Sequence, residues 1–234
     1  MSLARHIPRG LTLTVAALGL SWAIFVLPTS EAADQFRYLE SQLLHSENFS
    51  STTFAQQLAD AASQTLSDCD THSQTALALM EMRLTEIALR SGKLEEFDRL
   101  SNSLEARSRR VLTCAPREAF IWLLAFSLET LHGRLTERTF NLLAMSYETS
   151  PSEGWIAIRR NFVGMPLLLV MPVPLRLSFL NEFGQLISNG FQHEAALSYW
   201  AASLPIRSYL QPQIQQLDSS QRQRFWDAFQ KIQS

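Results

Sequence analysis

Apolar residues recur every three or four positions through most of the chain, and this spacing predicts amphipathic α-helices. The clearest case is the segment 71–92, where one face carries Leu77, Met80, Leu84 and Ile87. The segment stops at Gly92, a residue suited to the left-handed conformation that ends many helices. Residues 93–112 repeat the pattern, so the short turn at Gly92–Lys93 predicts two antiparallel helices.

Further stretches continue the helical pattern. Residues 117–133 are apolar almost all round, which predicts a central, buried helix that ends at Gly133. Thr136 is the expected N-cap of the next helix, and Gly190 ends another one later in the chain. The last residues predict a helix that begins at Asp218–Ser219 and covers the end of a helical stack with its polar side outward.

Residues 162–180 form a second kind of segment, an apolar run that contains three prolines and Arg176. The prolines and the charge argue against a membrane span. We expect a buried, extended connector laid over the helices, which becomes helical from Val173. Contact with lipid or with a membrane partner is the alternative interpretation.

Composition supports an all-α fold. The chain has 37 leucines but only 16 valines and isoleucines together, and eight glycines in 234 residues. Leucine favours helices, whereas sheets are rich in β-branched residues. The hydrophobic content of 46% is enough for a core, and the net charge of −2 gives no overall field that attracts nucleic acid. We therefore expect no nucleic-acid partner.

The N-terminus has the pattern of an export signal. A basic segment, MSLARHIPRG, precedes residues 11–27, which carry no charge. Pro28 ends the run, and small residues follow at Ser30 and Ala32, as at a cleavage site. The run is long for a signal peptide and slightly short for a span of about 20 residues. Cleavage after Ala32 and retention as an anchor therefore both stay open, and a buried core helix leaves the basic flank unexplained.

These features predict the organisation of the chain. Residues 1–33 are expected to be a signal peptide or membrane anchor, and residues 34–234 an all-helical domain with a further helix over 54–66. Because the positive charge precedes the apolar run, the domain should lie on the far side of the membrane.

The two cysteines lie at matching distances from the predicted turn. Cys69 is 23 residues before Gly92, and Cys114 is 22 residues after it. At 1.5 Å per residue both lie about 33–35 Å from the turn, at the open end of the hairpin. We expect a disulfide, which suits an oxidising compartment; two buried free thiols are the alternative. Neither cysteine has the spacing of a redox or zinc motif.

A repeat is suggested by Pro116 and Pro151, which are 35 residues apart, close to the tetratricopeptide period of 34. Trp122 and Gly133 fall near the positions where that repeat has an aromatic residue and a turn glycine. The segment resembles a degenerate tetratricopeptide repeat, although Arg138 replaces its usual small residue. The predicted fold is an all-α, TPR-like α-solenoid of stacked antiparallel helical hairpins, preceded by one N-terminal hydrophobic helix.

A second resemblance rests on three segments of the sequence: CAPREAFIWLL (114–124), LLAMSYETSP (142–151) and SPSEGWIAIRRN (150–161). Over roughly residues 69–165 they resemble a group of proteobacterial envelope proteins whose genes often lie beside exopolysaccharide biosynthesis and export genes. That resemblance implies no known activity. It favours a periplasmic interaction or scaffold protein that is held at the inner membrane through residues 11–27. Protein partners in the cell envelope are expected, and an acidic polysaccharide is a further candidate ligand.

Arginines supply the candidate binding residues. Four of them cluster at the end of the hairpin that holds the cysteines: Arg107, Arg109, Arg110 and Arg117. Two more, Arg159 and Arg160, are expected to project outward from a short helix capped by Ser152. Guanidinium groups bind carboxylates and phosphates with two hydrogen bonds, so these six are candidates for anion or partner binding. Solvated arginines are the simpler interpretation.

Catalytic motifs are not evident in the sequence. The five histidines are scattered, and there is no HExxH pair, GxSxG elbow or phosphate-binding glycine loop. We therefore expect no metal and no cofactor. A helical glycosidase or lyase needs only two carboxylates, and Glu118, Glu129 or Glu182 could supply them. An enzyme that acts on polysaccharide is thus the alternative to the scaffold hypothesis.

Overall fold

The computed structural model describes residues 15–22, 56, 67 and 69–233. From Cys69 to Gln233 every regular element is a helix, so the all-α prediction is confirmed for this part. Its elements are α3 (Thr71–Arg90), α4 (Leu94–Cys114), α5 (Ala119–Leu131), α6 (Glu137–Thr149), α7 (Gly154–Gly164), the 3-10 helix η2 (Met165–Leu167), α8 (Val173–Ser188), α9 (Gln192–Ala201), α10 (Leu204–Gln215) and α11 (Ser219–Gln233).

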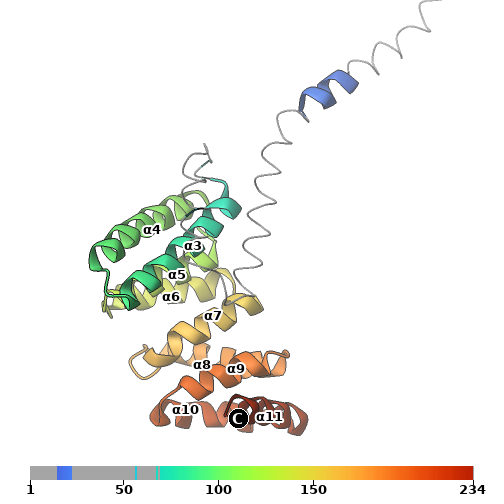
Figure 1. Cartoon of the computed structure of the whole chain (residues 1–234). Helices are drawn as coiled ribbons and strands as arrows, with labels where there is room; N and C mark the ends of the chain where they lie inside the picture. Colours follow the sequence, from blue (N-terminus) through green and yellow to red (C-terminus); the bar gives the residue numbers. More distant parts are fainter. Residues whose placement is uncertain (1–14, 23–55, 57–66, 68, 234) are drawn as a thin grey trace, which may run out of the picture.

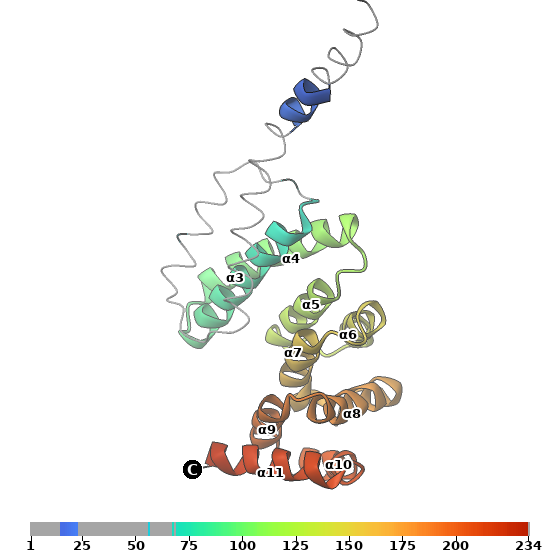
Figure 2. The ribbon, with the colours of Figure 1, turned by 90° about the vertical axis from the view of Figure 1, so that its right-hand side faces the viewer.

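The helices stack along one direction, with α3 and α4 at one end and α10 and α11 at the other (Figures 1 and 2). Helix α3 packs on α4 and α5 packs on α6 as hairpins. In the second half the packing changes, because α10 packs on α8 and α11 packs on α9. One continuous hydrophobic core runs through the stack, from Leu77 in α3 to Phe225 in α11.

Three glycines end helices as the sequence predicts. Gly92, Gly133 and Gly190 all have positive φ, between 69° and 99°. In each case the next residue donates its backbone N–H to a carbonyl five residues earlier, as Lys93 does to Ala88 at 2.9 Å. This arrangement satisfies carbonyls that the helix leaves open, and it needs a residue that tolerates the left-handed conformation. The three turns separate α3 from α4, α5 from α6, and α8 from α9.

The predicted N-caps are only partly correct. The Thr136 hydroxyl accepts from the backbone N–H of Thr139, and Asp218 accepts from that of Gln221 at 2.8 Å, which confirms these two caps. The expectation for Ser152 is wrong. The N-cap of α7 is Glu153, and its side chain makes no capping hydrogen bond.

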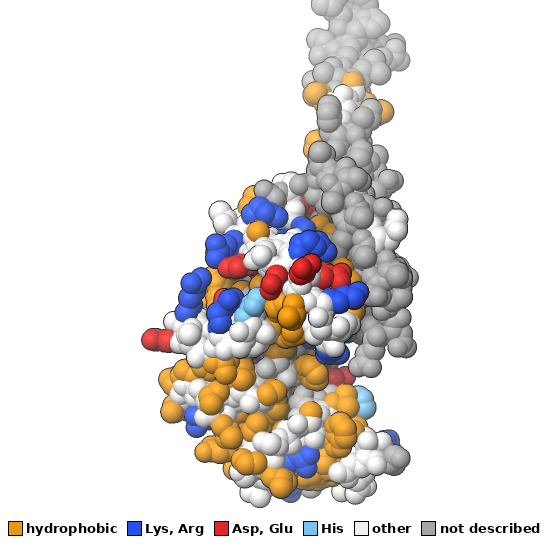
Figure 3. All heavy atoms as spheres, turned by 60° about the vertical axis from the view of Figure 1, so that its left-hand side comes forward, with side chains coloured by type: hydrophobic (Ala, Val, Ile, Leu, Met, Phe, Trp, Pro, Cys, Tyr) orange, Lys and Arg blue, Asp and Glu red, His pale blue; other side chains and the backbone are white. Residues whose placement is uncertain are grey.

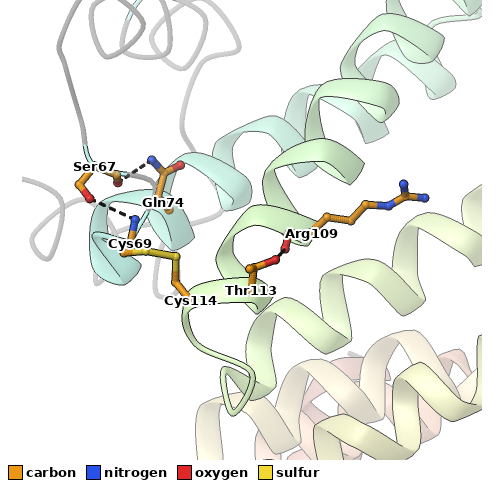
Figure 4. Close-up of a disulfide and its surroundings, with 6 residues drawn as sticks. All are labelled: Ser67, Cys69, Gln74, Arg109, Thr113 and Cys114. Carbon is orange, nitrogen blue, oxygen red and sulfur yellow. Dashed lines mark hydrogen bonds between the residues drawn. A yellow bond between two sulfur atoms is a disulfide. The ribbon is translucent and has the colours of Figure 1, made fainter.

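The two cysteines form the expected disulfide (Figure 4). Cys69 and Cys114 are bonded, with their Cα atoms 5.3 Å apart. The bond joins the start of α3 to the end of α4, at the open end of the hairpin. Beside it, the Ser67 hydroxyl accepts from the backbone N–H of Cys69 at 3.2 Å, and Gln74 donates to the Ser67 carbonyl at 3.1 Å. These contacts tie the chain before α3 to the hairpin.

The apolar run over residues 162–180 is not the buried, extended connector that we expected. It contains the end of α7, then η2, a turn, and the start of α8 at Val173. The end of α7 and the start of α8 pack closely at this bend. Gly164, the last residue of α7, permits this, because a Cβ there would lie 2.8 Å from the ring of Phe179 on α8. Several apolar side chains of this segment are exposed, including Phe162.

The N-terminal predictions lie mostly outside the described residues. Of the apolar run 11–27, residues 15–22 are described and are helical. The predicted helix over 54–66 is described only at Gln56. Among the helices that the structure describes, none combines the length and the apolar character that a membrane crossing requires.

The disulfide should contribute substantially to stability. It closes a loop of 45 residues, and the loop-entropy model assigns such a bridge about 4 kcal/mol. We expect the Cys69→Ala/Cys114→Ala variant to lose up to about this free energy of unfolding in chemical denaturation. Wild-type protein in excess reductant should lose a similar amount. Two thiols that react in denatured, unreduced protein from native envelopes would contradict the prediction.

Candidate functional site: a cleft between α4, α5 and α6

A cleft of about 380 Å³ opens where three successive helices meet. Helix α4 contributes five lining residues, α5 four and α6 two: Glu105, Ser108, Arg109, Leu112, Thr113, Trp122, Ala125, Leu128, Glu129, Arg138 and Leu142. On α4 and on α5 these residues recur at intervals of three or four positions, with adjacent pairs at 108–109, 112–113 and 128–129. That spacing places each set on one face of its helix. The cleft is therefore built from two facing helical stripes, with α6 at the side.

Apolar side chains and one indole form much of the cleft wall. Trp122 is half-buried, and its Nε1–H donates to the carbonyl oxygen of Pro116 at 2.9 Å, which fixes the ring. Ser108 also lines the cleft. It is buried, and its hydroxyl has no hydrogen-bond partner in the described part of the chain. A buried hydroxyl without a partner is costly, so a ligand that reaches it would gain a hydrogen bond.

Charged groups of both signs surround the opening. Arg109 pairs with Glu105 one turn earlier on α4, and Arg134 pairs with Glu129 at 2.6 Å. Arg138 is exposed and makes no hydrogen bond or ion pair to any described residue. Each exposed pair contributes little to stability in water. Their arginines can therefore turn to a carboxylate of a ligand at small cost.

The six predicted arginines do not form one cluster. Arg109 lines the cleft, and Arg110 and Arg117 are exposed on the same hairpin end. Arg159 lines a second pocket of about 40 Å³ between α3, α5 and α7. The remaining two, Arg107 and Arg160, are engaged inside the protein.

Arg107 forms a bidentate ion pair with Glu81 across the α3–α4 hairpin. Both N–O distances are 2.9 Å, and the side chains are 15% and 5% exposed. The third nitrogen of the guanidinium donates to Gln74. Arg107 is therefore engaged by an internal carboxylate, and its role in anion or partner binding stays a prediction that this pairing does not favour.

Arg160 is completely buried, so the expectation that it projects outward is wrong. It donates to Glu182 on α8 at 2.6 and 2.9 Å, and to the carbonyl oxygens of Ser146 and Ser150 at 2.8 and 3.0 Å. Those two carbonyls lie at the end of α6. The Ser146 carbonyl also accepts the backbone N–H of Ser150, whereas Arg160 is the donor to the Ser150 carbonyl. The guanidinium also lies over the ring of Tyr147, 4.4 Å from its centroid.

Tyr147 completes this network by donating its hydroxyl to Glu182 at 2.9 Å. Burial raises the pKa of Glu182, while the charge of Arg160 and the hydrogen bonds from Arg160 and Tyr147 oppose the shift. Burial also raises the pKa of Tyr147 well above its ordinary value. The network joins α6, α7 and α8 and has no exposed cation, so it is structural.

The three candidate carboxylates are not gathered at one place. Glu129 lines the cleft, whereas Glu182 is buried in the network with Arg160. Glu118 lies at the start of α5, where burial and then the charge of Glu153 raise its pKa. The cleft does hold a second carboxylate, Glu105, which sequence reasoning missed. The sequence signal for Glu105 is its spacing of four residues from Arg109, which places the two side chains next to each other on a helix.

Sequence reasoning also missed Arg138 as a site residue. In the sequence, this arginine stands out only as a departure from the tetratricopeptide pattern.

Comparisons of the chain with family models, with curated proteins and with solved structures find no match.

Breaking the Arg160 network should be far more damaging than breaking an exposed pair. Removing one partner of a buried ion pair costs about 3–5 kcal/mol, because the other charge stays buried. We expect Arg160→Met and Glu182→Gln each to lower the free energy of unfolding by about this amount. The matched control Arg109→Met should cost less than about 1 kcal/mol. Chemical denaturation followed by circular dichroism measures all three.

The double variant Arg160→Met/Glu182→Leu should cost much less than the sum of the two single changes, since no unpaired charge remains. It will still leave the Ser150 carbonyl without the donor that Arg160 provides. A loss for Arg160→Met as small as that for Arg109→Met would contradict the structural role.

Proposed function

We propose that this chain is an exported, membrane-associated helical scaffold protein that binds a protein partner of the cell envelope through the cleft between α4, α5 and α6. The observation that carries the proposal is the cleft itself: side chains from successive helices line it, and it combines an apolar wall with charges of both signs. Such a mixed surface suits a peptide segment, whose apolar and charged side chains it can match.

A protein partner fits the cleft better than an acidic polysaccharide does. The lining residues include two arginines, Arg109 and Arg138, and two glutamates, Glu105 and Glu129. The charges therefore balance, whereas a polyanion is bound by a surface with excess positive charge. The resemblance to envelope proteins encoded near exopolysaccharide genes supports a partner in polysaccharide assembly or export, and the polysaccharide itself is the competing ligand in the test below.

The repeat architecture belongs to the same proposal. We infer a TPR-like stack from the α3–α4 and α5–α6 hairpins and from the glycine that ends the first helix of each. Stacked hairpins of this kind present grooves lined by neighbouring helices. The second half departs from the pattern, because α10 packs on α8 and α11 packs on α9.

The location is inferred from two features. The disulfide between Cys69 and Cys114 suits an oxidising compartment. The basic segment and the uncharged run 11–27 suit an export signal or an inner-membrane anchor. Together they support the periplasmic side of the inner membrane.

The enzyme hypothesis keeps one specific observation in its favour. Glu105 and Glu129 both line the cleft beside Trp122, as a pair of carboxylates in a glycosidase would. Each of them pairs with an arginine, Arg109 and Arg134 respectively. This engagement favours binding over hydrolysis. Loss of polysaccharide cleavage in Glu105→Gln/Glu129→Gln would support the enzyme instead.

The proposal predicts a position-specific crosslink to one envelope protein. A photo-crosslinking amino acid at Leu142, inside the cleft, should capture a discrete protein in intact envelopes. The same group at Asn102, exposed on α4 outside the cleft, should not. Arg138→Glu should reduce the Leu142 crosslink about tenfold, because it reverses the one lining cation without an internal partner among the described residues.

The matched control is Arg99→Glu, which reverses an exposed arginine of α4 outside the cleft and should leave the crosslink unchanged. Polygalacturonate serves as the probe for the competing ligand in a calorimetric titration of the full chain. Equal crosslinks at Leu142 and Asn102 would refute the cleft as the binding site. Salt-sensitive binding of polygalacturonate that Arg138→Glu abolishes would replace the protein partner by a polysaccharide.

A further inference from the structure

Apolar side chains are exposed on the turn between η2 and α8 and on the first turns of α8. Leu169, Val170, Val173 and Leu177 are between 41% and 62% exposed. We call these four residues the loop patch. Three prolines of the same segment are also exposed: Pro166, Pro172 and Pro174. Soluble proteins rarely expose a contiguous apolar area of this kind without a partner for it.

The loop patch is held in place by an arginine. Arg176 donates to the carbonyl oxygens of Leu169 and Met171, at 3.2 and 2.9 Å. Its guanidinium lies over the ring of Tyr209 on α10, 5.8 Å from the centroid. The turn therefore presents its apolar side chains from a fixed backbone, with a cation and a half-exposed tyrosine beside them.

The charge around the loop patch has one sign. From Met165 to Ser188 and along α10 the only acidic residue is Glu182, which is buried and paired with Arg160. Two cations lie in the same stretches. Arg176 is beside the loop patch, whereas Arg207 is bonded to carbonyls at the end of α9. Figure 3 shows the contrast. Hydrophobic side chains predominate on the lower half of the view, formed by α7 to α11, with a few charged ones among them, whereas charges of both signs gather on the upper half.

We propose that the loop patch inserts into the interfacial layer of an anionic lipid bilayer. Apolar side chains next to cations, with tyrosine or tryptophan at their edge, are the features that bind a membrane surface. Anionic headgroups match the positive charge of Arg176 at the edge of the loop patch. Charge complementarity does not favour a second copy of this chain as the occupant, because the charged half of the molecule carries both signs. It does not single out another protein either.

The proposed bilayer contact goes beyond the cleft. It places the second half of the stack against a membrane. That this is the membrane to which the run 11–27 attaches the chain rests on the proposed function. The cleft lies on α4 to α6, at a different level of the stack. Binding at the two surfaces can therefore be tested separately.

The test uses the full chain with a single added cysteine, Leu169→Cys, labelled with the polarity-sensitive dye NBD. The two native cysteines are joined in the disulfide, so the added thiol is the only reactive one. The protein is mixed with vesicles of phosphatidylethanolamine and phosphatidylglycerol, with and without lipids that carry a nitroxide on the acyl chain. Leu94→Cys is the matched control, since Leu94 is an exposed leucine of α4 followed by two glutamates.

We expect a blue shift of the dye at position 169 and loss of most of its emission with the nitroxide lipids, and no change at position 94. Val173→Asp/Leu177→Asp should remove the quenching at 169 without unfolding the chain, because both side chains face solvent. Replacing phosphatidylglycerol by phosphatidylcholine should weaken the quenching roughly fivefold or more, as expected for cations near an anionic surface.

Two results would overturn the proposal. A blue shift without nitroxide quenching would show that another protein surface covers the loop patch. Protein that binds vesicles with neither a blue shift nor quenching at position 169 would show that another segment, such as the run 11–27, makes the membrane contact. Either result leaves the crosslink at Leu142 unaffected, and failure of that crosslink leaves the quenching at 169 unaffected. The two proposals therefore fail independently.

Discussion

Within the continuous core, the guanidinium group of Arg160 fixes how the second half of the stack sits on the first. It donates to the Ser146 and Ser150 carbonyls at the end of α6, pairs with Glu182 on α8, and packs on the ring of Tyr147. Any shift of α7 along the stack would leave a charge buried without its partner. A buried ion pair is weak evidence for net stability, because desolvation offsets its attraction. Its effect here is to select one arrangement of three helices among the several that an apolar contact alone would allow.

The same device recurs further along the chain. Arg207 of α10 donates to three carbonyl oxygens at the end of α9, at 2.7 to 3.0 Å, and Arg222 of α11 donates to two at the end of α10. Each arginine follows the helix whose end it closes, so it also fixes the direction in which the next helix leaves. Arg176 of α8 likewise donates to carbonyls of the turn before its own helix. These residues act where the first half has glycine turns. This explains why the second half holds its shape with only one glycine turn.

Much of the helical pattern could be predicted from the sequence, because it depends on local signals. The turns at Gly92 and Gly133 and the cap at Thr136 are encoded by neighbouring residues, and the disulfide follows from equal distances to a turn. The site could not be predicted in the same way. A buried arginine and a solvated one have the same sequence signature, so Arg107 and Arg160 were placed outside. Whether Arg138 faces a cleft depends on the α4–α5–α6 packing, which no local signal specifies.

The disulfide also bears on the cleft, because Thr113 lines it and is adjacent to Cys114. The bond fixes the end of α4 to the start of α3, and the Arg107–Glu81 pair fixes the middle of the same helix. The α4 side of the cleft is therefore rigid over the length that lines it, while the charged groups at the rim are exposed pairs that can exchange partners. A rigid wall with adaptable charges lowers the entropic cost of binding a segment and keeps selectivity for its sequence. The loop patch shares the fixed backbone but differs in chemistry, because exposed apolar side chains with a single cation beside them suit a lipid surface.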